Sequence, residues 1–220
     1  MHDPGPTAES PNAEGPEAGG NATQQLEALG VPNTEPQAYA ASSIGEPLWC
    51  CEILSEVVQH RQSLRSLREA EPELESIVHP FCIVVSQDCD LEQDFRIRQS
   101  GGSAPPLPNV LLCEVSSATE LKGAVPLGKD IWKRIIQNKD ERYQFLQGVP
   151  PLLDATKEGL PELGIDFRRY FGIPTDELYE QFNLRARRRC RLISPYKEHF
   201  MNRYAHFIAR VALPSDHFRG

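Results

Sequence analysis

Two short apolar runs constrain the fold of this chain more than any other feature. They are HPFCIVVSQ (residues 79–87) and NVLLCEVSS (residues 109–117), both rich in branched side chains, with Pro80 near the start of the first and Pro108 just before the second. Runs of this kind are typical of strands in the middle of a sheet. We therefore expect two central β-strands, joined by a loop over QDFRIRQSGGSAPPLP (residues 93–108).

The spacing of the other apolar residues predicts the remaining elements, with period 2 for strands and period 3.6 for helices. Strands are expected at residues 48–59, 142–146 and 163–171, and helices at residues 60–71, 131–138 and 174–182, the last with Thr175 in capping position. This alternation predicts an α+β protein, with a single β-rich domain over residues 45–220, a length that one hydrophobic core supports.

An amphipathic helix is predicted at the end of the domain, over residues 194–212. Ser194 is placed to cap it and Pro195 suits its first turn. One face is apolar and consists of Tyr196, Phe200, Tyr204, Phe207, Ile208 and Val211. The opposite face carries His199, Arg203, His206 and Arg210. This row suits phosphate binding or a solvated basic face, whereas arginines between the two histidines disfavour a metal ion.

The acidic residues are concentrated at the N-terminus. Residues 1–47 contain seven acids and no Lys or Arg, so they account for most of the net charge of -8. Their Pro, Gly, Ala, Glu and Asn residues cannot bury enough surface to offset chain entropy. We expect residues 1–44 to be a disordered acidic tail, in which TQQLEALG (residues 23–30) is an alternative helical turn for a protein partner.

The C-terminal part is basic, with eight Lys or Arg residues and one acid between Phe182 and Arg210. The run RARRRCR (residues 185–191) is typical of a nucleic-acid or phosphate patch. The residues predicted to bind RNA or DNA are Arg185, Arg187, Arg188, Arg189, Arg203 and Arg210. The alternative is a solvated edge strand whose charges block pairing with another sheet.

The six cysteines include no CxxC pair, so neither a disulfide framework nor a zinc knuckle is expected. Cys82 and Cys113 lie within apolar runs and are predicted to be buried. No apolar run approaches the roughly 20 residues that span a membrane, and the N-terminus lacks the pattern of a signal peptide. We expect a cytoplasmic protein without membrane contact, metal or cofactor.

The stretch VVSQDCDL (residues 84–91) places two acids and a thiol just past a predicted strand. Cys89 is a candidate nucleophile, although Asp88 and Asp90 disfavour its thiolate unless His79 or an arginine lies close. The two carboxylates are also candidates to hold a magnesium ion. Two structural interpretations remain: Asp88 makes a turn hydrogen bond while Cys89 packs inward, or both acids pair with arginines and join the terminal helix to the domain.

A family resemblance adds to this interpretation. His79-Pro80, the strand FCIVVS ending at Ser86, a polar loop and then NVLLCEVSS resemble the core of the PemK/MazF toxin family over residues 79–117. That resemblance implies a small SH3-like β-barrel that cleaves RNA, with His79 in place of the family's arginine and its hydroxyl at Ser116 or Ser117. Residues 45–214 also resemble uncharacterised prokaryotic proteins that share an SQDCD motif.

Three functions follow from these patterns. The first is a nucleic-acid-associated SH3-like barrel that uses His79, Ser116 and the basic C-terminal half. The second is a protein-interaction module without catalysis, in a prokaryotic stress or defence system, that binds a partner through its acidic tail or terminal helix. The third is a cysteine- or metal-dependent hydrolase centred on Asp88, Cys89 and Asp90. We favour nucleic-acid binding and leave open whether the protein is an enzyme.

Overall fold

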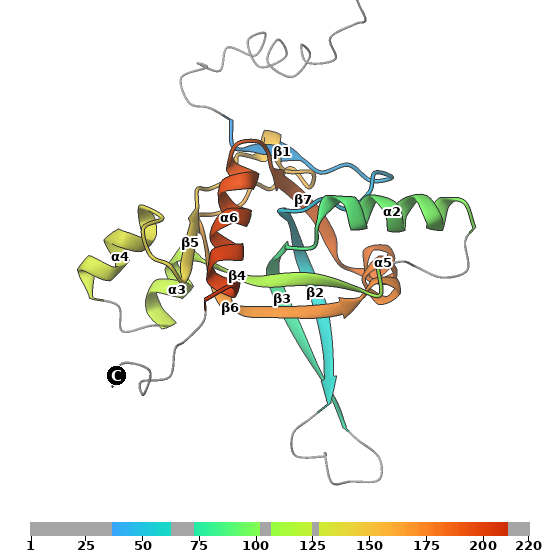
Figure 1. The fold of residues 1–220 in the computed structure, drawn as a ribbon, viewed down its shortest axis with the longest axis horizontal. Coiled ribbons are helices and arrows are strands. Elements are labelled where there is room, and N and C mark those ends of the chain that lie inside the picture. Colours follow the sequence, from blue (N-terminus) through green and yellow to red (C-terminus); the bar gives the residue numbers. More distant parts are fainter. Residues whose placement is uncertain (1–36, 63–72, 102–106, 125–127, 211–220) are drawn as a thin grey trace, which may run out of the picture. The chain divides into compact units, whose positions relative to one another are not determined.

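The computed structural model describes residues 37–62, 73–101, 107–124 and 128–210. They form an α+β domain with one antiparallel sheet in the order β1-β7-β2-β3-β4-β6-β5 (Figure 1). The strands are β1 (Tyr39–Ala41), β2 (Glu52–Gln62), β3 (Leu74–Val84), β4 (Asn109–Ser117), β5 (Tyr143–Leu146), β6 (Leu163–Pro174) and β7 (Arg187–Leu192). The helices are α2 (Asp88–Gln99), α3 (Ala118–Ala124), α4 (Lys129–Ile136), α5 (Thr175–Leu184) and α6 (Tyr196–Ile208), with a 3-10 turn η2 (Pro151–Leu153).

The predicted α+β class is confirmed, and the two apolar runs form β3 and β4 as expected. These strands are neighbours, with Ile83 opposite Cys113. The sheet curls so that its edge strands approach each other, and the Tyr39 hydroxyl donates a hydrogen bond to the carbonyl of Gln147, just after β5, at 2.8 Å. No ladder joins β1 to β5 in the described part of the chain, so the sheet is open rather than a closed barrel.

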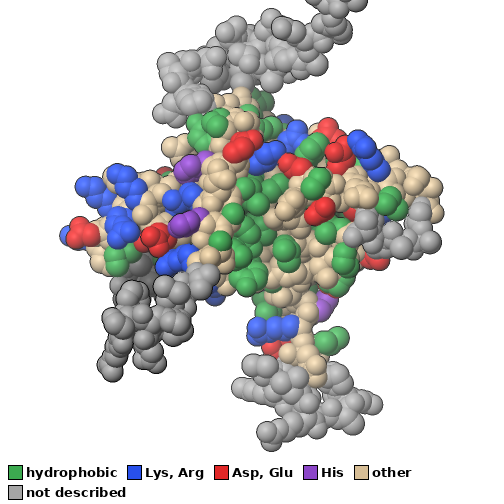
Figure 2. Space-filling view, in the orientation of Figure 1, with side chains coloured by type: hydrophobic (Ala, Val, Ile, Leu, Met, Phe, Trp, Pro, Cys, Tyr) green, Lys and Arg blue, Asp and Glu red, His purple; other side chains and the backbone are tan. Residues whose placement is uncertain are grey.

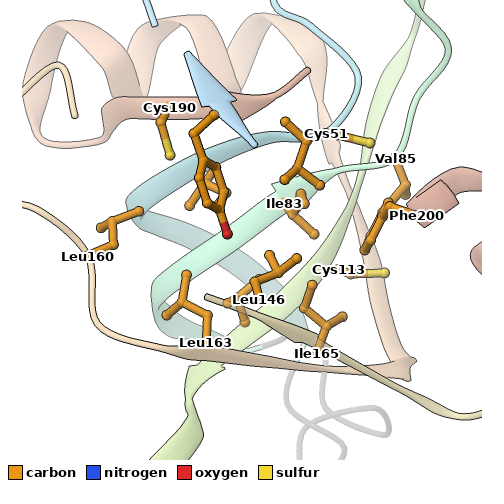
Figure 3. Close-up of a cluster of buried hydrophobic side chains, with 14 of the residues drawn as sticks. Cys51, Ile83, Val85, Cys113, Leu146, Leu160, Leu163, Ile165, Cys190 and Phe200 are labelled. Atoms are coloured by element: carbon orange, nitrogen blue, oxygen red, sulfur yellow. The ribbon is translucent and has the colours of Figure 1, made fainter. Parts of the chain in front are cut away.

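Three apolar clusters hold the domain together. The first lies within the curl of the sheet, where Phe200 of α6 packs among strand residues such as Ile83 and Ile165 (Figure 3). The second lies on the other face of the sheet, where Leu91 of α2 and Leu178 of α5 are buried. The third joins α3, α4 and β5. Because both faces of the sheet are covered where β3 ends, its last residues, 81–84, are continuously apolar.

One element was predicted wrongly as a loop. The first seven residues of the stretch 93–108 belong to α2, which begins at Asp88. Side chains four residues apart support this helix, because Arg96 pairs with Glu92 and Arg98 pairs with Asp94. The acids in the first turn and arginines in the last turn also suit the helix dipole.

The N-terminal boundaries also differ from the prediction. Tyr39–Ala41, expected in the disordered tail, form β1 and pair with β7, while residues 1–36 lie outside the described part of the chain. Residues 60–62, expected to start a helix, extend β2, and the rest of that predicted helix lies outside the described residues. Backbone pairing with a neighbouring strand outweighs the local preference in both places.

The caps of two predicted helices differ in detail. The Thr175 hydroxyl donates to the carbonyl of Leu107 and does not cap α5. α6 begins at Tyr196, one residue after Pro195, and Ser194 makes no capping hydrogen bond. The stripe of α6 packs on Phe167 through Phe200, Tyr204 and Phe207, as predicted. Ile208, predicted in the same stripe, is exposed, and Val211 lies outside the described residues.

Gly164 of β6 allows α3 to pack closely on the sheet. A Cβ at this position would overlap the end of the Leu121 side chain and lie 3.3 Å from its Cβ. We expect Gly164→Ala to lower the free energy of unfolding by about 1–3 kcal/mol, because overpacking displaces neighbouring groups. Gly123→Ala is the control, since a Cβ there meets nothing within 4 Å, and it should leave stability unchanged or raise it. Equal urea midpoints for both variants would contradict close packing at Gly164.

Candidate functional site

The acids of VVSQDCDL lie at the start of α2. The Asp88 carboxylate accepts hydrogen bonds from the backbone N–H of Cys50 at 2.7 Å and from Nζ of Lys197 at 2.8 Å. The hydrogen bond to Asp88 raises the pKa of Lys197. Asp88 therefore joins three segments: the turn before β2, α2 and α6. The inference that Asp88 holds the terminal helix agrees with these contacts, except that its partner is a lysine rather than an arginine. Asp90, expected to do the same, forms no ion pair within the described residues.

The other residues of the motif have separate roles. Cys89 is exposed, and its sulfur lies 3.6 Å from side-chain oxygens of Gln87 and Asp90. The expectation that it packs inward is therefore wrong. Ser86 is buried, and its hydroxyl accepts the N–H of Leu111 at 2.9 Å, which joins the end of β3 to β4. The described residues contain no cluster of three His, Cys, Asp or Glu side chains that is suited to a metal ion.

His79 is a buried residue of β3, with 4% of its surface exposed. Its ring stacks on Phe171 with centroids 4.1 Å apart. Nε2 lies 3.2 Å from Oε1 of Gln59, and Nδ1 faces Glu114 at 3.8 Å. Burial lowers the pKa of His79, and this effect outweighs the opposing influence of Glu114.

These contacts place His79, expected as a catalytic residue, in the interior of the domain. A substrate has no access to the ring in this conformation, and no hydrogen bond joins His79 to Ser116 within the described residues. Ser116 lies on β4 opposite Gly164, and the neighbouring Ser117 forms a capping box with Glu120 at the start of α3. His79 and Ser116, the two residues expected in an active site, therefore do not form a common site in this structure.

Two arginines of RARRRCR point into the protein. Arg188 makes two hydrogen bonds to the fully buried Glu52, at 2.6 and 2.9 Å. Arg189 binds Asp154, also fully buried, at 2.9 and 2.7 Å. Burial raises the pKa of Asp154, but hydrogen bonds from Arg189 and Thr156 outweigh that effect and hold the pKa below its usual range.

The interpretation of this run as a solvated edge strand is therefore wrong, whereas its role in nucleic-acid binding stays a prediction. β7 lies between β1 and β2, so it is an interior strand and not a solvated edge. Arg188 and Arg189 have their guanidinium groups committed to buried carboxylates and are not available to phosphates. Arg185 and Arg187 are exposed and have no carboxylate partner among the described residues.

The predicted basic row of α6 contacts the loop after α4. The Arg203 guanidinium donates to Oε1 of Gln144 at 2.6 Å and to the carbonyls of Tyr143, Asn138 and Asp140. All four acceptors are neutral, and burial lowers the pKa of Arg203. Arg210 lies 3.3 Å from Glu141 in the same loop. Arg203 thus holds α6 against this loop without neutralising its own charge.

Further cations lie beside this row, and sequence reasoning did not select them. Lys129, Lys133 and Arg134 are exposed on α4, and Lys139 is exposed just after it. None of the four pairs with a carboxylate among the described residues. The helix was predicted from its apolar positions, and the signal that could have found these cations is the charge of the remaining positions in KDIWKRII.

We call this surface the α4–α6 basic face. It consists of Lys129, Lys133, Arg134, Lys139, His199, Arg203, His206 and Arg210. Figure 2 shows Lys, Arg and His side chains gathered over the part of the molecule that carries α4 and the adjoining side of α6.

Comparisons of the chain with protein-family models, curated proteins and solved structures find no match. Among the described residues, no helix is both long enough and apolar enough to cross a membrane.

The position of Asp88 generates a stability prediction. We expect Asp88→Asn to lower the free energy of unfolding by roughly 1 kcal/mol, because the partly exposed ion pair with Lys197 is lost. Asp90→Asn is the matched control: it removes the same interaction with the helix dipole, but the exposed Asp90 has no ion pair within the described residues, so it should cost less stability than Asp88→Asn. Chemical denaturation measures both, and equal losses would argue against a clamp specific to Asp88.

The lowered pKa of His79 predicts a pH effect. Below the ordinary histidine pKa of about 6.5, the unfolded state binds a proton that folded His79 does not, so stability falls as pH falls from about 7 towards 5. His79→Phe keeps the stacking ring and removes this titration, so its melting temperature should fall less over that range. His206→Gln, at an exposed position, should retain the parent's slope. If the melting temperature of His79→Phe depends on pH as steeply as that of the parent, His79 is not the group responsible.

Proposed function

We propose that the protein binds nucleic acid through the α4–α6 basic face. The observation that carries this proposal is the kind of partner that each arginine of the protein has. Where the chain uses arginines structurally, in β7, it places buried carboxylates against them. Arg203 instead donates to four neutral oxygens, so no carboxylate hydrogen-bonds to its positive charge between α6 and the loop after α4 within the described residues.

The neighbouring charges extend this positive surface. Lys129, Lys133 and Lys139 add charges that the described residues do not neutralise, and within those residues the Arg134 guanidinium bonds to the Lys139 carbonyl and to no carboxylate. The acids nearby include Asp130, at the start of α4, Asp140, whose charge raises the pKa of Arg203 against the effect of burial, and Glu141, which pairs with Arg210. A cluster of exposed cations on one face is the usual electrostatic footprint of phosphate-backbone binding.

We also propose that the protein is related to the PemK/MazF family, as the resemblance of residues 79–117 implies. The curled, open sheet would then be a form of the SH3-like barrel. The adjacent antiparallel β3 and β4 support this relationship, and so does the Tyr39–Gln147 bond across the gap between the edge strands. The buried position of His79 favours binding over RNA cleavage as the role of this chain.

Matched double variants test the location of the interface. Lys129→Gln with Lys133→Gln removes two charges from α4, and Arg185→Gln with Arg187→Gln removes two exposed charges near the start of β7. We expect the α4 pair to weaken binding to a fluorescent RNA or DNA oligonucleotide. It should also reduce the slope of log affinity against log salt by up to about two units, since each phosphate contact contributes roughly one.

The Arg185 and Arg187 variant should bind with the parent's affinity and salt slope. A loss of binding in that variant alone would place the interface at the RARRRCR run instead. Absence of salt-dependent binding by the parent protein would overturn nucleic-acid binding altogether and favour the protein-interaction module.

A further inference from the structure

The turn before β2 contains two adjacent cysteines whose sulfurs face each other. Sγ of Cys50 lies 3.7 Å from Sγ of Cys51, within hydrogen-bonding distance for thiols. Cys51 has a φ of 63°, which is unusual for a residue with a side chain. Both residues are buried in the first core, and Figure 3 shows Cys51 there with Val85 and Phe200.

The backbone of this pair is connected to both helices that meet at Asp88. The Cys50 N–H donates to Asp88, and the Cys51 N–H donates to the carbonyl of Val84 at 2.8 Å, at the end of β3. The Cys51 sulfur also lies 3.9 Å from the backbone carbonyl of Lys197 in α6. Lys197 and Asp88, which contact the pair, have side chains that are about one-third exposed.

We propose that Cys50 and Cys51 are a thiol-oxidation site, at which a hydroperoxide converts the two adjacent thiols into a disulfide. In this reaction two S–H bonds break and one S–S bond forms. The protein loses two protons and two electrons, and the O–O bond of the peroxide is cleaved to give water and an alcohol, or two waters from hydrogen peroxide. The sulfurs need to approach by less than two ångströms, since a disulfide bond is about 2.05 Å long.

The product is a strained disulfide. Adjacent Cα atoms are about 3.8 Å apart across a trans peptide, whereas disulfides usually join Cα atoms about 4.4–6.8 Å apart. Strained disulfides are reduced more readily than structural ones, so the modification is reversible by a dithiol. The hydrogen bond with Cys50 and burial both raise the pKa of Cys51, so oxidation here is slower than at the exposed Cys89.

Ring closure affects the clamp at Asp88. The eight-membered ring contains the peptide bond between Cys50 and Cys51, so the Cys51 N–H must turn and its bond to Val84 is weakened. The Cys50 N–H is attached to the same ring and moves relative to Asp88. Oxidation therefore loosens the first turns of α2 and α6.

The experiment uses the full chain with Cys89→Ser, which removes the exposed thiol. After hydrogen peroxide treatment, and before alkylation, we expect a product lighter than the reduced protein by two hydrogens and restored by dithiothreitol. Alkylation under denaturing conditions should then add two fewer alkyl groups to this product than to the reduced protein. Peptide mapping should place the linkage within the peptide that contains both Cys50 and Cys51. Cys50→Ser and Cys51→Ser should each abolish this product, and Cys82→Ala, at another buried cysteine, should retain it.

Hydrogen exchange tests the structural consequence in the same protein. Amides in the first turns of α2 and α6 should exchange faster after oxidation, and those of α4 should not change. A product in which Cys50 and Cys51 remain alkylatable, or one that carries added oxygen without loss of hydrogen, would overturn the proposal. The peptide mapping uses protein in which Cys50 and Cys51 are both present. It therefore tests the proposal even if a serine variant fails to fold.

Discussion

The two arginine–carboxylate pairs of β7 are the interactions on which the rest of the sheet depends. Glu52 and Asp154 are fully buried, so their charges are tolerated only because guanidinium groups bind them in bidentate geometry. Arg188 also donates to the carbonyls of Glu46 and Pro47, and Arg189 to that of Gly159. Each pair therefore connects β7 to a separate irregular segment as well as to an acid.

The prediction from sequence was accurate where local composition decides the structure. The strands β3, β4, β5 and β6 and the helices α4, α5 and α6 follow from runs and spacing of apolar residues. It was wrong for α2, whose stability depends on pairs such as Glu92–Arg96 and on the burial of few side chains, of which Leu91 is one. It was also wrong for Tyr39–Ala41, which form a strand only because β7 is present to pair with them.

The candidate site was harder to predict because charge alone does not distinguish a structural cation from a free one. Glu52 is 136 residues from Arg188 in the sequence, and no local pattern connects them. The run RARRRCR therefore resembled a binding patch although two of its arginines are internal. The α4 cations are exposed because the apolar face of their helix packs on β5 through Ile135, and the predicted face of α6 was correct for the same reason.

The consecutive positions of Arg188 and Arg189 have a consequence for how the sheet assembles. Ile53 faces Cys190 and Leu54 faces Arg188, so Arg189 is the extra residue of a β-bulge. This bulge lets neighbouring residues reach acids in different segments. A slip of β7 by one residue would leave both guanidinium groups without their acids and bury charge without compensation. Because every shifted alignment carries this cost, the charges of Arg188 and Arg189 specify the register of β7. An apolar strand of the same length could not specify its register in this way.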